Sequence, residues 1–238
     1  MSSLYCFRHG QAGLRDDYDT LSETGLRQAG ILGEFLAGRD MKFDAFYTGG
    51  LNRQRQTALA IRDAYFAVGV ELPEPVTDAN WNEFDLEAVY RGIAPRLAAE
   101  NKEFRREYEA LERESADAGS MVHRRWTAAD VAVVRAWIEG RHSCEAESWA
   151  DFTERVRRGL DTLAAAGEKA RIAVSTSATP IGVWMGLALG LESRFIMRAA
   201  GALCNASITT FRLRGGEVYP GTFNQIGHFA DPSLVTFR

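Results

Sequence analysis

Apolar and polar positions near the start of the chain change from a strand-like to a helical spacing. A short apolar run at residues 4–7 stops at the polar segment Arg8-His9-Gly10, which predicts a buried strand that ends in a loop. Ser22 then precedes apolar residues at helical spacing as far as Gly38, which predicts an N-capped helix.

A second predicted strand and a second predicted helix follow the first pair. Residues 44–48 predict a second strand, and the next segment predicts a helix that stops at Gly69. The apolar face of this helix consists of Thr57, Ile61, Ala64 and Val68. Strands and helices that alternate through short connections favour a sheet covered by helices.

The middle of the chain, residues 84–146, carries many charges and little strand pattern. Phe104, Tyr108 and Leu111 are spaced i, i+4 and i+7, as on one face of a helix. We expect a mostly helical insertion that forms a cap over one end of the sheet. The alternative is a set of solvated helices without a further role, and the charges alone favour that alternative.

The strand and helix pattern returns after the insertion. Ser148 is placed to cap a helix, and residues 171–174 predict a buried strand. Thr179 as N-cap, followed by Pro180 at the first helical position, predicts a helix that runs to Leu189.

Two final strands are predicted at residues 208–213 and 218–223, around a turn at Gly215-Gly216. The fold class is therefore expected to be α/β, a three-layer α/β/α sandwich around a mostly parallel sheet. The expected organisation is a single domain over residues 1–238, with 84–146 as the helical cap insertion.

Composition narrows the class of protein. Of the 238 residues 46% are hydrophobic, which favours a globular protein. The 28 basic and 32 acidic side chains leave a net charge of −4, which argues against a nucleic-acid binder. The longest apolar run, residues 181–191, is too short to span a bilayer, and the N-terminus does not resemble a signal peptide. We expect a soluble cytoplasmic protein without a membrane partner. The distant Cys6, Cys144 and Cys204 indicate neither a disulfide framework nor a zinc site.

Two segments carry candidate chemistry. In open α/β sheets ligands bind beyond the carboxyl ends of strands, which is where Arg8-His9-Gly10 falls. A histidine there can act as nucleophile or base, and an arginine can hold an oxyanion. Arg53 lies in the first turn of the helix after the second strand. The simpler alternative for Arg8-His9-Gly10 is an ordinary turn. For Arg53 and the nearby Arg55 it is surface charge, and for Arg55 that interpretation is favoured.

Together these segments resemble the histidine phosphatase superfamily, which has the phosphoglycerate-mutase-like fold. The matching pieces occur in order over essentially the whole chain. They are Arg8-His9-Gly10, residues 21–29, Leu51-x-Arg53-x-x-Gln56-Thr57-Ala58, Asn82-Glu83-Phe84, Glu147-Ser148 and the strand at 172–175.

The resemblance implies roles for individual residues. His9 would be the nucleophile that forms a phosphohistidine, with Arg8 and Arg53 binding the phosphate oxygens. Glu83 would donate a proton to the leaving alcohol and then accept one from water; without the resemblance it would be read as a surface carboxylate. The residues expected to line the phosphate pocket are Gly10, Gln11, Ser22, Thr176 and Ser177. No metal and no organic cofactor is implied.

One position departs from the family pattern. Members usually carry a second histidine directly after the late core strand, where this chain has Thr176 followed by Ser177. A threonine can donate a hydrogen bond to a phosphoryl group, but it supplies no positive charge. We expect the remaining histidines, His123, His142 and His228, to be structural or exposed and not to replace it.

The expected function is hydrolysis of a small phosphomonoester, with reduced or unusual activity because of Thr176. The alternative is a catalytically weakened or inactive family member that binds a phosphorylated ligand or a protein partner. A third interpretation is another reaction class in the same pocket. The sequence leaves the identity of the phosphoester and the oligomeric state open.

Overall fold

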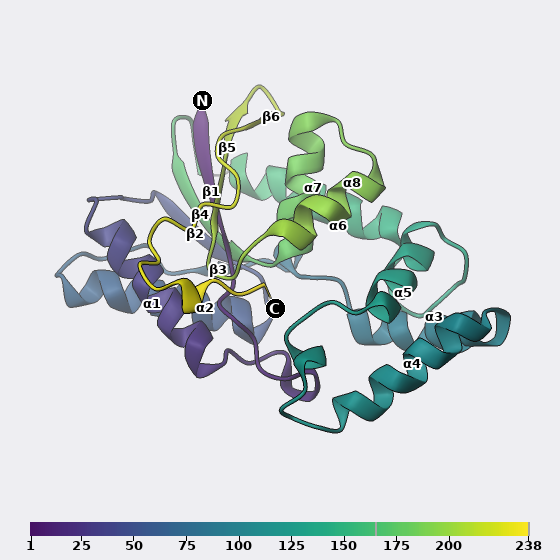
Figure 1. Ribbon diagram of the computed structural model, residues 1–238. Helices are drawn as coiled ribbons and strands as arrows, with labels where there is room; N and C mark the ends of the chain where they lie inside the picture. The colour runs from purple at the N-terminus through teal and green to yellow at the C-terminus, as the bar shows by residue number, and fades with distance from the viewer. Residues whose placement is uncertain (165, 238) are drawn as a thin grey trace. The chain divides into compact units, whose positions relative to one another are not determined.

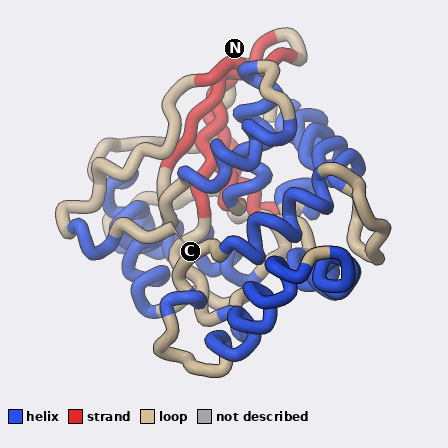
Figure 2. The backbone as a smooth tube through the Cα atoms, turned by 45° about the vertical axis from the view of Figure 1, so that its right-hand side comes forward, coloured by secondary structure: helices blue, strands red, loops and turns tan. Residues whose placement is uncertain are grey.

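The apolar run at the N-terminus forms the central strand of a mixed sheet in the computed structural model, which describes residues 1–164 and 166–237. The strands are β1 (Ser2–Arg8), β2 (Ala45–Thr48), β3 (Val76–Thr77), β4 (Arg171–Thr176), β5 (Ile208–Arg214) and β6 (Glu217–Pro220). They form one six-stranded sheet in the order β3-β2-β4-β1-β5-β6. Figure 2 shows these strands lying side by side.

The sheet is parallel on one side and antiparallel on the other. Strands β1 to β4 run parallel, whereas β5 pairs antiparallel with β1 and β6 antiparallel with β5. The β5–β6 turn contains Gly215 (φ 58°) and Gly216 (φ 81°), the backbone that a tight hairpin turn requires. Arg8 is the register partner of Thr176, so β1 and β4 end next to each other.

Helices pack on both faces of this sheet (Figure 1). They are α1 (Glu23–Ala37), α2 (Asn52–Ala67), α6 (Trp149–Ala164), α7 (Ala178–Leu189) and α8 (Ser193–Ala202). On one face Leu32 of α1 and Ile61 of α2 share a buried cluster with Phe7 of β1. On the other face Trp184 of α7 packs 6.0 Å from Phe211 of β5, between ring centroids. The predicted α/β/α fold class is confirmed.

The contacts of the chain divide it into two units. The core unit consists of Met1–Gly13, Asp17–Glu83 and Arg155–Phe237, and the helical unit of Leu14–Asp16 and Phe84–Glu154. The helical unit contains α3 (Leu86–Glu100), α4 (Lys102–Ser115), α5 (Ala128–Ile138) and the start of α6. Its role as a cap stays a prediction.

A buried ion pair holds the short segment Leu14–Asp16 within the helical unit. Arg15 donates from both terminal nitrogens to Asp130, at 3.1 and 2.7 Å, and the Asp130 side chain has no exposed area. Asp130 also accepts from the Tyr90 hydroxyl and from the Thr127 amide. Because a buried carboxylate needs such partners, Arg15 is structurally required there.

Three sequence predictions need correction. Helix α7 begins at Ala178 with Ser177 as its N-cap, so the predicted start at Thr179 was wrong. Ser177 already has extended backbone angles (φ −118°, ψ 176°), and Pro180 is tolerated in the first turn, where no amide partner exists. Strand β6 ends at Pro220, earlier than predicted, and α8 has no counterpart among the predicted elements.

No helix in residues 1–164 and 166–237 is both long enough and apolar enough to cross a membrane.

The backbone of α1 touches the loop after β1 at two glycines. A Cβ atom on Gly25 would lie 2.1 Å from the Gln11 carbonyl oxygen, and one on Gly10 would lie 2.3 Å from the Gly25 carbonyl oxygen. Side chains at these positions would therefore push α1 away from the segment that carries His9.

We expect Gly25→Ala to lower the free energy of unfolding by about 1–3 kcal/mol, the usual cost of overpacking. The matched control is Gly30→Ala in the same helix, because a Cβ there would meet nothing within 4 Å. This control should raise the free energy of unfolding by about 0.5–1 kcal/mol through helix propensity. Urea unfolding measures both, and equal effects of the two substitutions would contradict the close approach.

Candidate active site

His9 directly follows β1 and is fixed through its backbone. Its amide donates to the Thr176 carbonyl at 2.8 Å, and its carbonyl accepts from the Asn205 side chain and the Ala206 amide, each at 3.2 Å. Only 2% of His9 is exposed. The position of the imidazole therefore depends on the end of β4 and on the loop before β5.

One hydrogen bond sets the tautomer of His9. Nδ1 lies 2.7 Å from the Gly10 carbonyl oxygen. Because a carbonyl only accepts, Nδ1 carries the proton and Nε2 carries the lone pair. Burial, followed by the charges of Arg53 and Arg8, holds the pKa of His9 well below its ordinary value of 6.5. At neutral pH the imidazole is uncharged and Nε2 is nucleophilic.

Arg8 is 4% exposed and is held by backbone carbonyls. Its terminal nitrogens donate to the carbonyls of Leu203 and Phe237. Burial lowers the pKa of Arg8, and the nearby Tyr18 and Glu83 oppose this shift. Its Nε atom is buried and has no hydrogen-bond partner among the described residues.

Arg53 lies in the first turn of α2 and is 7% exposed. Its Nη1 donates to Asp19 at 2.9 Å, and its Cζ lies 5.0 Å from the ring centroid of Tyr18. In the part of the chain that the structure describes, its buried Nε has no partner either. Arg55, two residues later on the same helix, is exposed as expected.

Glu83 lies at the N-terminus of α7. Its Oε2 accepts from the Thr179 amide at 3.1 Å, where a helix N-terminus favours a negative charge. Glu83 also interacts electrostatically with Arg8, while Arg8 and Arg53 both act on His9. The structure thus brings together the four residues that the sequence nominated for catalysis.

Thr176 and Ser177 are engaged within the protein. The Thr176 hydroxyl is buried and donates to the Trp81 carbonyl at 2.6 Å. The Ser177 hydroxyl accepts from Gln54 Nε2 at 2.9 Å, and Gln54 also donates to the Trp81 carbonyl at 3.1 Å. A hydroxyl can donate only one hydrogen bond. Thr176 donates it to the carbonyl of Trp81, which lies two residues before Glu83 in the chain.

Gln11 and Ser22 support the loop that follows His9. The Ser22 hydroxyl donates to Gln11 Oε1 at 2.9 Å and accepts from the Gly25 amide at 3.1 Å, which confirms Ser22 as the N-cap of α1. The Gln11 amide donates to Gln28 at 2.7 Å. The Gly10 amide donates to the Thr57 hydroxyl at 3.1 Å.

Sequence reasoning missed several contributing residues. Gln28 and Gln54 are fully buried. The sequence pattern that could have revealed them is a polar amide on the inward, apolar face of a helix. Tyr18 and Asn205 lie in loops, where no periodic pattern marks them. Tyr18 lies with its ring centroid 6.5 Å from that of His9, in an edge-to-face arrangement.

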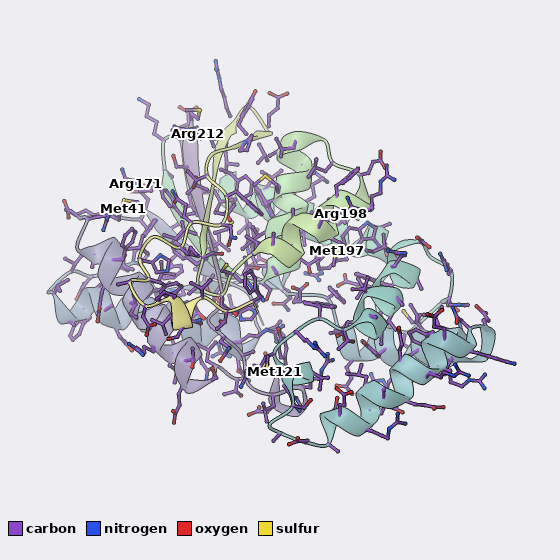
Figure 3. All side chains as sticks on the ribbon, viewed as in Figure 1. Met41, Met121, Arg171, Met197, Arg198 and Arg212 are labelled. Atoms are coloured by element: carbon purple, nitrogen blue, oxygen red, sulfur yellow. The ribbon has the colours of Figure 1, made fainter. Side chains whose placement is uncertain are left out.

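Positive charge elsewhere on the sheet lies far from this site. Arg171 and Arg212 are both register partners of Ser3, near the opposite end of β1 from His9. Figure 3 labels these two side chains near the N-terminal end of the sheet. The cationic character around His9 therefore comes from Arg8 and Arg53.

The other histidines have contacts of their own. In the helical unit, His123 accepts from the Arg15 amide at 3.2 Å, and His142 lies 3.4 Å from the Glu100 carboxylate. His228 lies between Phe35 and Phe229, at ring-centroid distances of 5.4 and 4.1 Å. Over residues 1–164 and 166–237, no group of three or more His, Cys, Asp or Glu side chains is arranged to hold a metal ion.

Comparison with protein families identifies the class of this chain. Residues 4–133 and 121–225 match the model of the histidine phosphatase superfamily (branch 1). The chain belongs to this superfamily. A comparison with curated proteins gives no significant match.

Solved structures share the fold at low sequence identity. Phosphoglycerate mutase from Bacillus anthracis is 17% identical at a TM-score of 0.62, with 95% of this chain and 94% of that chain covered. A mycobacterial glucosyl-3-phosphoglycerate phosphatase is 19% identical at 0.60, with 94% and 99% covered. Phosphoserine phosphatase from Entamoeba histolytica is 20% identical at 0.59, with 96% and 99% covered. Structural relatives of the chain thus include both phosphatases and a mutase.

The buried His228 is expected to make the stability of the folded protein depend on pH. Burial lowers the pKa of His228 to about 4, below its ordinary value of 6.5. Between these values the unfolded chain binds a proton that folded His228 does not, so stability falls as the pH falls through this window. We expect His228→Phe to remove about 1–2 kcal/mol of the loss in unfolding free energy between pH 7 and pH 5. Denaturant unfolding at both pH values measures this, and an unchanged pH dependence would contradict it.

Proposed function

We propose that the chain is a phosphatase that hydrolyses a small phosphomonoester through a phosphohistidine at His9. One arrangement carries the proposal: a neutral, buried imidazole lies under the influence of two buried guanidinium groups. The Nε atoms of Arg8 and Arg53 have no partner among the described residues, and an unpaired buried donor costs free energy. Phosphate oxygens would satisfy both donors with charge-assisted hydrogen bonds.

In the first step the lone pair of His9 Nε2 attacks phosphorus. The bond from phosphorus to the ester oxygen breaks, and Glu83 in its protonated form gives its proton to the leaving alcohol. The Nδ1 proton stays on the imidazole and keeps its hydrogen bond to the Gly10 carbonyl, which supports the positive charge that develops on the ring. Arg8 and Arg53 stabilise the negative charge on the phosphoryl oxygens.

In the second step water attacks the phosphohistidine. The Glu83 carboxylate takes a proton from this water, the P–N bond breaks, and inorganic phosphate leaves. His9 returns to its neutral form, and Glu83 has regained the proton that it gave up. The two steps need no metal ion and no organic cofactor.

Hydrolysis is favoured over a mutase reaction. A mutase has to protect its phosphorylated enzyme from water, and the described residues of the site offer no feature that indicates such protection. The alternative of a weakened or inactive protein that binds a phosphorylated ligand is supported by Thr176, whose proton is occupied by Trp81. Retention of a nucleophile and an acid beside the two arginines favours the enzyme, because binding alone requires neither.

We expect His9→Ala to lower the rate of p-nitrophenyl phosphate hydrolysis by about 10³-fold or more, because the phosphoryl acceptor is lost. Glu83→Gln should lower kcat by about 10²–10⁴-fold, the usual contribution of a general acid. Steady-state assays on purified protein, with a panel of phosphometabolites, measure both. Equal rates for the parent protein and His9→Ala would refute the catalytic claim.

Phosphate binding is tested separately, with two arginines of the same helix. Loss of a charge-assisted hydrogen bond predicts that Arg53→Ala weakens phosphate binding by about ten- to a hundred-fold. Arg55→Ala removes the same charge from an exposed position and should leave the affinity nearly unchanged. Calorimetry with inorganic phosphate distinguishes the two variants. Phosphate binding without turnover would favour the alternative function, and equal losses in both variants would contradict the site.

A further inference from the structure

The carbonyl oxygen of Trp81 accepts hydrogen bonds from two different elements of the core unit. The Thr176 hydroxyl, at the end of β4, donates to it at 2.6 Å. Gln54 Nε2, in the first turn of α2, donates to it at 3.1 Å. Thr176, Gln54 and Trp81 have no exposed area. Both lone pairs of this carbonyl are therefore occupied, in surroundings where water does not weaken the hydrogen bonds.

A second contact lies two residues further along the chain, at Glu83. Its Oε2 accepts from the Thr179 amide at 3.1 Å, in the first turn of α7. Trp81 and Glu83 belong to one short segment of the chain, and Thr176 and Thr179 belong to another. The two segments are thus joined at both ends, by the Thr176–Trp81 bond and by the Thr179–Glu83 bond. A shift of the Trp81 carbonyl would therefore move the Glu83 carboxyl group relative to the start of α7.

The indole ring of Trp81 packs against two helices. It stacks on the ring of Trp184 in α7, with 5.2 Å between ring centroids and an angle of 21° between the ring planes. A Cβ atom on Gly159 in α6 would lie 3.0 Å from the same indole ring, so α6 also approaches it closely. The ring contacts fix the side chain of Trp81, and the two hydrogen bonds fix the peptide plane that leads to Glu83.

The Thr176 hydroxyl is committed to this carbonyl. A hydroxyl can donate one hydrogen bond, and here the acceptor lies 2.6 Å away. Turning the hydroxyl towards a phosphoryl oxygen would break this buried bond. The Nε atoms of Arg8 and Arg53, by contrast, are buried and have no partner in the described part of the chain. These hydrogen bonds favour a role for the arginines at the phosphoryl group and a role for Thr176 at the segment of the acid.

We propose that Thr176 is a positioning residue, whose hydroxyl fixes the Trp81 carbonyl and thereby directs Glu83 to the leaving oxygen. This inference rests on the proposed phosphatase function. Thr176 keeps its proton and touches no reacting atom, so the bonds made and broken in the two steps are unchanged. A displaced acid transfers its proton to the leaving alcohol more slowly. Loss of the Thr176 hydroxyl should therefore act on the departure of the leaving group and not on the binding of phosphate.

The test is Thr176→Val, which keeps the shape of the side chain and removes the hydroxyl. Phenyl phosphate and p-nitrophenyl phosphate share one ring, but the nitro group stabilises the phenolate, which then leaves with less help from an acid. The ratio kcat/KM covers the steps up to release of the phenol. We expect it to fall about tenfold for phenyl phosphate and less than about twofold for p-nitrophenyl phosphate. The affinity for inorganic phosphate should stay within about twofold of the parent value.

Two further variants serve as controls. Thr176→Ser restores the hydroxyl and should return kcat/KM for phenyl phosphate nearly to the parent value. Thr209→Val removes another fully buried threonine hydroxyl, which accepts from the Asn224 amide at 3.2 Å, and should leave both substrates unaffected. A loss of similar size with both substrates in Thr176→Val, or a loss of phosphate affinity, overturns the proposal. The hydroxyl would then act on the phosphoryl group or on the fold as a whole.

A measurement without turnover separates this inference from the proposed function. Hydrogen exchange at the Thr179 amide, followed by NMR, reports the contact of this amide with Glu83. Thr176→Val should speed the exchange by about tenfold, and Thr209→Val should leave it unchanged. A parent protein without phosphatase activity overturns the proposed function, and the exchange rate then decides on Thr176. An exchange rate that is unchanged in Thr176→Val overturns the positioning role.

Discussion

The proposed chemistry of this protein depends on a histidine that is kept neutral by its surroundings. Burial removes the water that would stabilise an imidazolium, and two guanidinium groups make a further positive charge unfavourable. The Gly10 carbonyl accepts a hydrogen bond from Nδ1–H, which keeps the proton on Nδ1 and the lone pair on Nε2. The pairing of β1 with β4, the close approach at Gly10 and Gly25, and the hydrogen bonds of Gln28 and Asn205 fix the backbone that carries this ring.

Thr176 is engaged in a hydrogen bond within the protein, and its place in a phosphate pocket stays a prediction. Its hydroxyl fixes the Trp81 carbonyl, and Gln54 and Ser177 join the same group of hydrogen bonds. Glu83 follows two residues later and is held by the first turn of α7. The end of β4 therefore helps to position the segment that carries Glu83.

The sequence predicted the sheet, its flanking helices and the superfamily, because apolar periodicity and short motifs are local signals. It also predicted His9, Arg8, Arg53 and Glu83 as site residues; in the structure Arg8 and Arg53 act electrostatically on His9, and Glu83 acts on Arg8. The partner of the Thr176 hydroxyl and the position of Tyr18 could not be predicted. Both depend on which loops meet at the ends of the strands, and no spacing along the chain encodes that.

The central claim is that His9 is the phosphoryl acceptor. The most direct measurement is to mix the protein with p-nitrophenyl phosphate, stop the reaction in base, which preserves phosphohistidine, and locate the modification by mass spectrometry. We expect an acid-labile phosphoryl group on the peptide that contains His9, and none in His9→Ala. Turnover accompanied by phosphorylation of a different residue, or turnover that persists in His9→Ala, would contradict it.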